Sequence, residues 1–280
     1  MQAEFTEDQE QFREMVSRFL QEKSRPSDVR RLMATQEGYD PAVWQQLCGE
    51  VGLAGTHIPE AYGGFGFGPI ELGIAAEEMG RHLFCGPFFA SAVMVAYALL
   101  HLAAEDAKQE HLPGIAAGTI LATLVLDDLN APERVGQGIS AEAGQLHGLA
   151  PLVLDAQIAT LFLVVAREGA SLGLYALSGE AEGLCIEPVT ALDPTRKLSS
   201  VRFEGAAARR IGGVTLEALN ATWDHICVAL AHEMIGGAQH LLESTVDYTK
   251  MRYQFGRPIG SFQGLKHRCA DLLMEVEMTK

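Results

Sequence analysis

Five cations lie close together near the end of a chain that is otherwise acidic. The run RYQFGRPIG at residues 252–260 carries two arginines, and the whole group is Lys250, Arg252, Arg257, Lys266 and Arg268. A guanidinium binds phosphate or carboxylate oxygens through planar, charge-assisted hydrogen bonds, so the run has the chemistry of an anion site. The same residue types also suit a basic loop that balances acidic neighbours. Type and spacing alone leave both interpretations open.

The overall charge argues against two classes of partner. The chain has 21 Lys and Arg against 36 Asp and Glu, a formal net charge of −15, and a pI near 5.0. Binding to nucleic acid or to an anionic membrane requires a basic face, so we expect neither partner. A length of 280 residues with 48% hydrophobic ones predicts two or three domains with a substantial core.

The cysteines predict reduced thiols rather than disulfides or a metal site. They are scattered, odd in number and form no Cys-x-x-Cys pair: Cys48, Cys85, Cys185, Cys227 and Cys269. No Cys/His spacing suits zinc, and isolated histidines such as His57, His82, His101 and His147 are expected to be structural. The acidic, amphipathic N-terminus lacks the features of a signal peptide, so we expect a cytoplasmic protein.

One uncharged segment, residues 87–104, reaches the minimum length of a membrane-spanning helix. It includes Ser91, Tyr97 and His101, and two acidic residues follow it at once. We therefore expect this segment to be a helix that is buried on all sides within a helical domain.

Hydrophobic periodicity predicts an α+β fold in three parts. Residues 1–117 have helical spacing, with Thr6 and Asp40 as expected N-caps, and form an all-α domain. Residues 118–213 hold short segments rich in Val, Leu and Ile, separated by Gly, Asp or Pro, which is typical of an antiparallel β barrel or sandwich. Residues 214–280 return to helical spacing.

The last part contains two long amphipathic helices, one from about residue 215 and one over 262–280. Their apolar faces need to be covered by other elements. We therefore expect a C-terminal helical bundle that is present only in part, completed by a further segment of chain or by a partner helix.

Three motifs make the chain resemble the FAD-dependent acyl-CoA dehydrogenase family along nearly its whole length. They are PEAYGGFGFG with EEMGR after it, LDPTRKLSSVRFEGA at the end of the β part, and YTKMRYQFGRPIGSFQGLKHRCADL. The last motif is the most specific. It most resembles bacterial members, including those that act on bulky acyl-CoAs such as steroid side chains.

The resemblance implies a cofactor role for the basic turn. In the family, an Arg-x-x-Phe-Gly turn and the Gln that follows it contact FAD held mainly by a neighbouring subunit. Carried over by position, Arg252 is expected to pair with the FAD pyrophosphate, and Gln254 and Phe255 to flank the adenosine. Gln263, with Phe262 before it, is expected to contact FAD from the start of the next helix.

The alternative for each cation of the turn is an ion pair with the acidic surface. For Arg252 the motif favours the cofactor contact over this alternative. For Arg257, Lys266 and Arg268 we expect the ion pair.

The middle part departs from the family. Members normally carry a Thr-Glu-Pro-x-Ala-Gly-Ser-Asp type segment and a Trp-Ile-Thr/Ser-Asn segment, which hold the flavin ring and cover the substrate. This chain reads LVLDDLNAPERVGQG at 124–138 and LAPLVLDAQ at 149–157, and its two tryptophans lie elsewhere. The resemblance therefore implies that the chain does not bind a flavin of its own.

The catalytic base is not visible either. Removal of an α-proton from a thioester needs a carboxylate against that carbon. At one family position for this base the chain has Ile226, and the other lies beyond Lys280. Glu233 lies about 10 Å along the helix axis from Ile226, so we expect it to be a surface or interface residue. Asp224 matches a family residue that helps to bind acyl-CoA, although Cys227 replaces its usual Arg neighbour.

We therefore expect an oxidoreductase subunit that introduces an α,β double bond into an acyl-CoA and works with a sister subunit in a heterotetramer. FAD would be held mainly by that sister, and an electron-transfer flavoprotein is a possible acceptor. Two alternatives stay open: an active homo-oligomer with a divergent flavin loop, and a non-catalytic scaffold that stabilises a flavin-binding partner.

Overall fold

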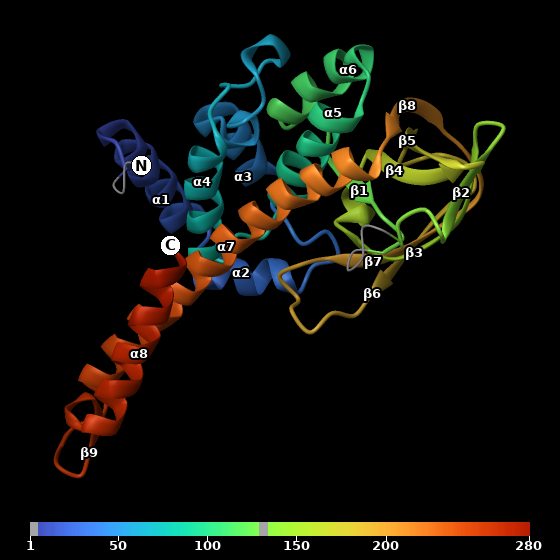
Figure 1. Cartoon of the computed structure of the whole chain (residues 1–280). Coiled ribbons are helices and arrows are strands. Elements are labelled where there is room, and N and C mark those ends of the chain that lie inside the picture. Colours follow the sequence, from blue (N-terminus) through green and yellow to red (C-terminus); the bar gives the residue numbers. More distant parts are fainter. Residues whose placement is uncertain (1–4, 129–133) are drawn as a thin grey trace. The chain divides into compact units, whose positions relative to one another are not determined.

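The computed structural model describes residues 5–128 and 134–280 (Figure 1). The chain forms two compact units, and each is assembled from separate stretches of sequence. One contains Pro26–Leu72 and Cys85–Cys227, and the other contains the described part of residues 1–25 together with Gly73–Phe84 and Val228–Lys280. The division predicted at residues 117 and 213 stays a prediction.

Helices form the first part of the larger unit. They are α2 (Pro26–Met33), α3 (Pro41–Gln46), η1 (Leu47–Val51), η2 (Leu53–Gly55), η3 (Glu60–Tyr62), η4 (Phe88–Val95), α5 (Ala96–Leu102) and α6 (Glu105–Ala116). Asp40 caps α3, since its carboxylate accepts a hydrogen bond from the Ala42 N–H at 3.0 Å, as the sequence predicts. Gly52 ends η1 in the left-handed conformation that suits glycine.

The uncharged segment is a buried helix, as expected. All eight residues of η4 are buried, and α5 continues it with five more buried residues. None of the helices in the described ranges is long and apolar enough to cross a membrane.

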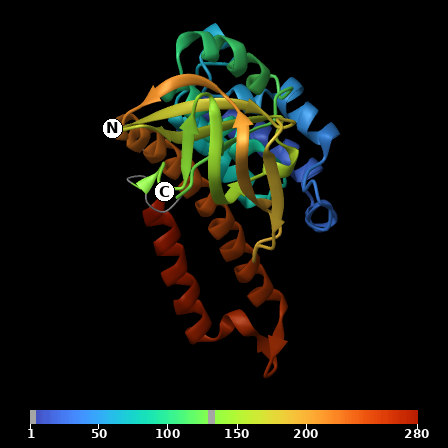
Figure 2. The same cartoon turned by 90° about the vertical axis from the view of Figure 1, so that its right-hand side faces the viewer.

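The rest of the larger unit is an eight-stranded sheet, seen with its strands facing the viewer in Figure 2. The strands are β1 (Ala122–Val125), β2 (Ile139–Glu142), β3 (Gln145–Leu154), β4 (Leu161–Glu168), β5 (Ser171–Ser178), β6 (Leu184–Val189), β7 (Leu198–Ala207) and β8 (Arg209–Val214). Their order is β6-β7-β3-β2-β4-β5-β8, with β1 paired to β4. Phe162, Tyr175 and Phe203 are among the side chains of its buried core.

The predicted antiparallel sheet is instead mixed. Most neighbours are antiparallel, but β1 and β2 both pair with β4 in parallel. The connection from β1 to β4 contains the β2–β3 hairpin, so it is long enough for the crossover that parallel pairing requires. The register of β3 against β7 shifts between Ala150 and Val153, which accommodates Pro151, a residue with no N–H.

The smaller unit contains α1 (Glu7–Lys23), most of α4 (Pro69–Arg81), the greater part of α7 (Leu216–Met251), and α8 (Gln263–Thr279). Thr6 caps α1 in a reciprocal capping box with Gln9, which confirms the expected N-cap. Arg13 of α1 pairs with Glu77 of α4 at 3.0 Å.

The backbones of α4 and α7 touch within this unit. A Cβ atom on Gly236 would overlap the carbonyl oxygen of Glu77, and one on Gly80 would overlap that of Glu233. Arg81 of α4 forms an ion pair with Glu243 of α7 beside this crossing, and its hydrogen bond holds the pKa of Glu243 below its usual value. Glycine is therefore required where the two helices cross.

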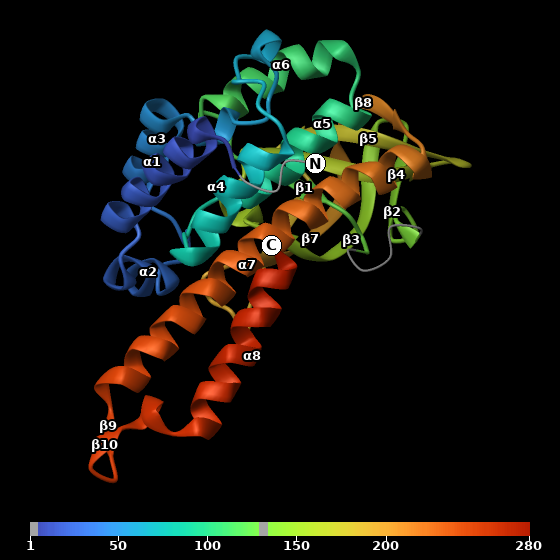
Figure 3. The same cartoon turned by 60° about the vertical axis from the view of Figure 1, so that its left-hand side comes forward.

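Helices α7 and α8 run side by side in opposite directions, as Figure 3 shows. The short strands β9 (Tyr253–Gln254) and β10 (Arg257–Pro258) and the turn η7 (Ile259–Ser261) join them. The order of a helical part, a β part and a helical part confirms the predicted fold class.

We predict that Gly236→Ala lowers the free energy of unfolding by about 1–3 kcal/mol or more, because its methyl group would force α4 and α7 apart. Gly237→Ala is the matched control: its Cβ would lie at an ordinary 3.6 Å from the Gly80 carbonyl oxygen, and alanine favours a helix. Urea unfolding curves of both variants measure the difference. Equal stability of the two variants would contradict the close crossing.

Candidate functional site

A strained hairpin tip separates α7 from α8. Gln254 pairs with Arg257 across it, and the two residues between them have positive φ, 54° at Phe255 and 76° at Gly256. Two such residues suit the tight turn that joins antiparallel strands, but an aromatic residue at positive φ is an outlier. Phe255 is also 91% exposed. The hairpin therefore displays an aromatic ring on a two-residue turn, at a conformational cost of about 1–2 kcal/mol.

Arg252 has a fixed backbone and an unpaired side chain. Its N–H donates to the Tyr248 carbonyl at 2.9 Å, and its own carbonyl accepts from the Ile259 N–H at 2.8 Å. The guanidinium is exposed and has no ion pair or hydrogen bond within the described part of the chain. The ion pair with the acidic surface, the alternative for this residue, is therefore not formed here, and all the donors of Arg252 remain available.

Arg257 contacts an aromatic ring instead of an acid. Its guanidinium lies over the Phe262 ring, 4.1 Å from the centroid, and the Phe255 ring meets Phe262 edge-on at 6.1 Å. The ion pair expected for Arg257 is wrong for the residues that the structure describes. A guanidinium stacked on a ring at a surface contributes about 0.5–1 kcal/mol, so Arg257 holds Phe262 in place.

The start of α8 adds further unpaired donors. No side chain caps the helix at Phe262, and its first turn carries no acidic residue. Gln254, Gln263, Lys266 and Arg268 are exposed, with no side-chain hydrogen bond or ion pair to another described residue. A helix N-terminus carries partial positive charge and attracts anions. Within the described ranges, Lys250 is the only one of the five cations that pairs with an acid, Asp247 at 2.9 Å. The ion pairs expected for Lys266 and Arg268 are therefore not formed there, and the cluster does not simply balance acidic neighbours.

In the β part, the Asp127 carboxylate, which follows β1, binds backbone N–H groups of its own loop. Asp127 accepts hydrogen bonds from the N–H groups of Gly136, at 2.7 Å, and Gly138, and Arg167 donates to the Gly136 carbonyl at 2.9 Å. This loop is where the family's flavin-binding pattern is missing from the sequence; its residues 129–133 lie outside the described ranges. Backbone donors that converge on one point form an anion site, and here Asp127 occupies it.

The residues considered for proton abstraction and acyl-CoA binding lie on α7. Ile226 is only 2% exposed, whereas Asp224 is exposed and Glu233 is half-buried. Burial raises the pKa of the Cys227 thiol, and the charge of Asp224 raises it further. Across the described residues, no group of three or more His, Cys, Asp or Glu side chains is placed to hold a metal ion.

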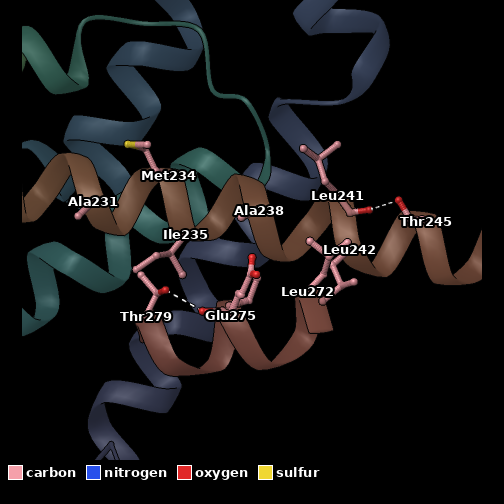
Figure 4. Close-up of a pocket in the computed structure, with 11 residues that line it drawn as sticks. Ala231, Met234, Ile235, Ala238, Leu241, Leu242, Thr245, Leu272, Glu275 and Thr279 are labelled. Atoms are coloured by element: carbon pink, nitrogen blue, oxygen red, sulfur yellow. Dashed lines mark hydrogen bonds between the residues drawn. The ribbon is translucent and has the colours of Figure 1, made fainter. Parts of the chain in front are cut away.

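An apolar groove of about 520 Å³ lies between α7 and α8. In Figure 4, Leu241 and Leu242 of α7 and Leu272 of α8 line this space, and the Glu275 side chain points toward it. Leu241 is 68% exposed. A groove lined by exposed apolar side chains is typical of a surface that contacts another protein segment.

Comparisons with known proteins all identify the same family. The acyl-CoA dehydrogenase N-terminal domain matches residues 6–119, and the acyl-CoA dehydrogenase C-terminal domain matches residues 216–280. The chain is 33% identical to acyl-CoA dehydrogenase IpdE2 of Mycobacterium tuberculosis over 96% of its own length and 72% of that protein. It is 30% identical to the probable acyl-CoA dehydrogenase YngJ of Bacillus subtilis, over 100% of its length and 78% of that protein.

Solved structures share the fold. A variant of the Tcur3481–Tcur3483 steroid ACAD superposes with a TM-score of 0.85 at 27% identity, covering 97% of this chain and 74% of that one. The ChsE4–ChsE5 complex of Mycobacterium tuberculosis gives 0.88 at 24% identity, covering 99% and 76%. At 24% identity, the similarity to the ChsE4–ChsE5 complex shows the fold alone.

We predict that Phe255→Asn raises the free energy of unfolding by about 1 kcal/mol, because Asn tolerates positive φ and Asn-Gly is a favoured hairpin turn. Gly256→Ala should have the opposite effect: nothing lies within 4 Å of its added Cβ, so only backbone strain changes. Thermal and urea unfolding of the two variants test this. A destabilised Phe255→Asn variant would show that the ring contributes more to the fold than its backbone costs.

Proposed function

We propose, from the premise that the chain belongs to the acyl-CoA dehydrogenase family, that it is one subunit of an FAD-dependent enzyme that introduces an α,β double bond into an acyl-CoA thioester. Its own contribution is the cross-subunit half of the FAD site. The observation that carries this proposal is the Arg252 guanidinium, which has no partner among the described residues, in the same connection between α7 and α8 as the exposed, strained Phe255.

The donors of the hairpin fit the phosphate and adenosine parts of FAD. Arg252 offers a planar set of N–H donors for pyrophosphate oxygens, and the uncapped start of α8 offers backbone N–H groups. Phe255 and Phe262 offer apolar ring surface for the adenine, and Gln254 and Gln263 offer amides for its polar edge or for the ribose. When bound, FAD supplies the acceptor for the hydride that leaves the acyl chain.

The flavin itself is assigned to a sister subunit. In the β part of this chain, the donors of Gly136 and Gly138 are used by Asp127, so they are not available to a flavin. The hairpin donors, in contrast, have no partner in the described part of this chain. The proposed arrangement therefore pairs the hairpin of this chain with FAD held mainly by the sister.

The catalytic base is also assigned to the sister. Ile226 occupies one family position for the base, and an isoleucine cannot accept a proton. Asp224 is exposed on α7, where its carboxylate is proposed to contact the polar part of the acyl-CoA, although Cys227 stands in place of the usual Arg. No catalytic residue of this chain is proposed.

A relative supports the proposed partner and substrate class. The Tcur3481–Tcur3483 protein, which is 27% identical to this chain, is described as a steroid ACAD and bears two protein names. We propose a heterotetramer of this chain with a sister acyl-CoA dehydrogenase subunit, acting on a bulky, steroid-type acyl-CoA. We also propose, from membership of the family, that the enzyme transfers its electrons to an electron-transfer flavoprotein.

We predict that the chain purified alone is colourless and that co-expression with its sister yields a flavin-containing complex. The sister's flavin site provides the part that Asp127 fills here. The ratio of visible flavin absorbance to protein concentration measures the result. Stoichiometric flavin on the chain alone would establish an active homo-oligomer. If the sister subunit turns over the substrate equally well without this chain, this chain is a scaffold.

We predict that Arg252→Ala weakens FAD retention in the assembled complex by about ten- to a hundredfold, since hydrogen bonds to charged groups contribute about 1.5–3 kcal/mol. Arg18→Ala is the matched control, because Arg18 is an exposed helical arginine with no ion pair to another described residue. The FAD dissociation constant is measured at matched thermal stability. Equal retention in both variants would show that Arg252 does not touch the cofactor. Arg257→Ala is not a suitable control, because it frees the Phe262 ring.

A further inference from the structure

Three histidines and a tyrosine form a cluster that the proposed FAD chemistry does not use. His57 lies between η2 and η3, Tyr97 and His101 lie one turn apart on α5, and His225 lies on α7. The Tyr97 ring is central: its centroid is 4.4 Å from that of His57, 5.6 Å from His101 and 4.9 Å from His225. The rings of His101 and His225 are 5.0 Å apart. All four residues belong to the larger unit.

Hydrogen bonds fix the tautomers of the two outer histidines when they are neutral. The Thr222 hydroxyl donates to the Ala218 carbonyl at 2.7 Å, so it accepts from His101 Nδ1–H at 3.2 Å. His225 Nδ1–H donates to the Ala221 carbonyl at 2.7 Å. In these tautomers the Nε2 atoms of both rings carry no hydrogen.

His57 is the inner member and has no such bonds. It is 8% exposed, and neither of its ring nitrogens has a hydrogen-bond partner among the described residues. Burial, and then the like charge of His101 and His225, lower the pKa of His57 to about 4. The charge of Lys108 on α6 likewise lowers the pKa of His101, after burial and the charge of His225. Among the described residues no carboxylate shifts the pKa of His57, so an imidazolium there would be buried without a counter-ion from them.

We propose that His57, Tyr97, His101 and His225 form an acid-sensitive latch that holds the start of α7, residues 216–227, against α5 only while His57 is neutral. The rings of His57 and His225 both contact the Tyr97 ring, so these contacts join the segment between η2 and η3 to α5 and α7. Protonation accumulates like charge around Tyr97. Movement of the start of α7 away from α5 lets water reach His57 and separates its charge from His225.

The sign and size of the effect follow from the two pKa values of His57. Its pKa is lower with the latch closed than its ordinary 6.5, so the latch is strongest above pH 6.5 and weakens as the pH falls toward 4. Protonation of this one ring raises the equilibrium constant for opening about 20-fold between pH 7 and pH 5.

Trp223, two residues before His225, reports on the start of α7. Trp44, the other tryptophan, is 2% exposed and hidden from a quencher. Acrylamide quenching of the full chain is measured from pH 7.5 to pH 4.5. We expect quenching of Trp223 to rise as the pH falls below 6.5 in the parent and in His147→Gln, which removes an exposed histidine on β3. In His57→Phe the rise should be absent above pH 5.

An unchanged rise in His57→Phe, or no rise in the parent, overturns the latch. If His57→Phe does not fold, the parent alone decides the matter through the ring-proton NMR shifts of its histidines. A His57 ring whose titration coincides with the rise in quenching, at a midpoint below pH 6.5, supports the latch. A rise in quenching while the His57 ring stays neutral overturns it. A His57 ring that titrates near pH 6.5 contradicts it.

Discussion

The close approach of two helix backbones governs the part of the molecule to which we assign a function. Gly80 and Gly236 allow α4 and α7 to touch, and the Arg81–Glu243 ion pair lies beside that crossing. Backbone contact leaves little freedom for α7 to slide or rotate on α4. The far end of α7 continues into the β9–β10 hairpin, so the position of Arg252 and Phe255 depends on how firmly α7 is held. A bulkier residue at the crossing would therefore disturb the hairpin without touching it.

Two sets of hydrogen-bond donors behave in opposite ways, and the contrast underlies the proposed function. In the loop after β1, the backbone N–H groups of Gly136 and Gly138 converge on the carboxylate of Asp127, so that anion site is filled from within. At the hairpin, the Arg252 guanidinium and the start of α8 have no acidic partner in the described ranges, although the chain has a net charge of −15. In such an acidic chain, an unpaired cation cluster favours an anion brought by another molecule.

Local signals in the sequence predicted the fold well, and contacts between distant residues set the limit. Thr6 and Asp40 cap the helices at the positions that the sequence predicts, because caps depend on neighbours within four residues. The parallel pairing of β1 and β2 with β4 escaped prediction because the choice of strand partners is a tertiary feature. The same holds for the candidate site: the motif pointed to Arg252, but neither the stacking of Arg257 on Phe262 nor the positive φ of Phe255 has a local signal. Asp127 and the histidine cluster join residues that are far apart in sequence, so single-residue arguments treated them as ordinary.

The central claim is that one flavin site is shared between two different chains, one supplying the hairpin and the other most of the FAD contacts. The most direct measurement is the ratio of FAD to total chains in the purified complex with the sister subunit, from flavin absorbance after denaturation and quantitative amino-acid analysis. The account predicts one FAD for every two chains, because this chain holds no flavin in its own β part. One FAD for every chain would contradict it.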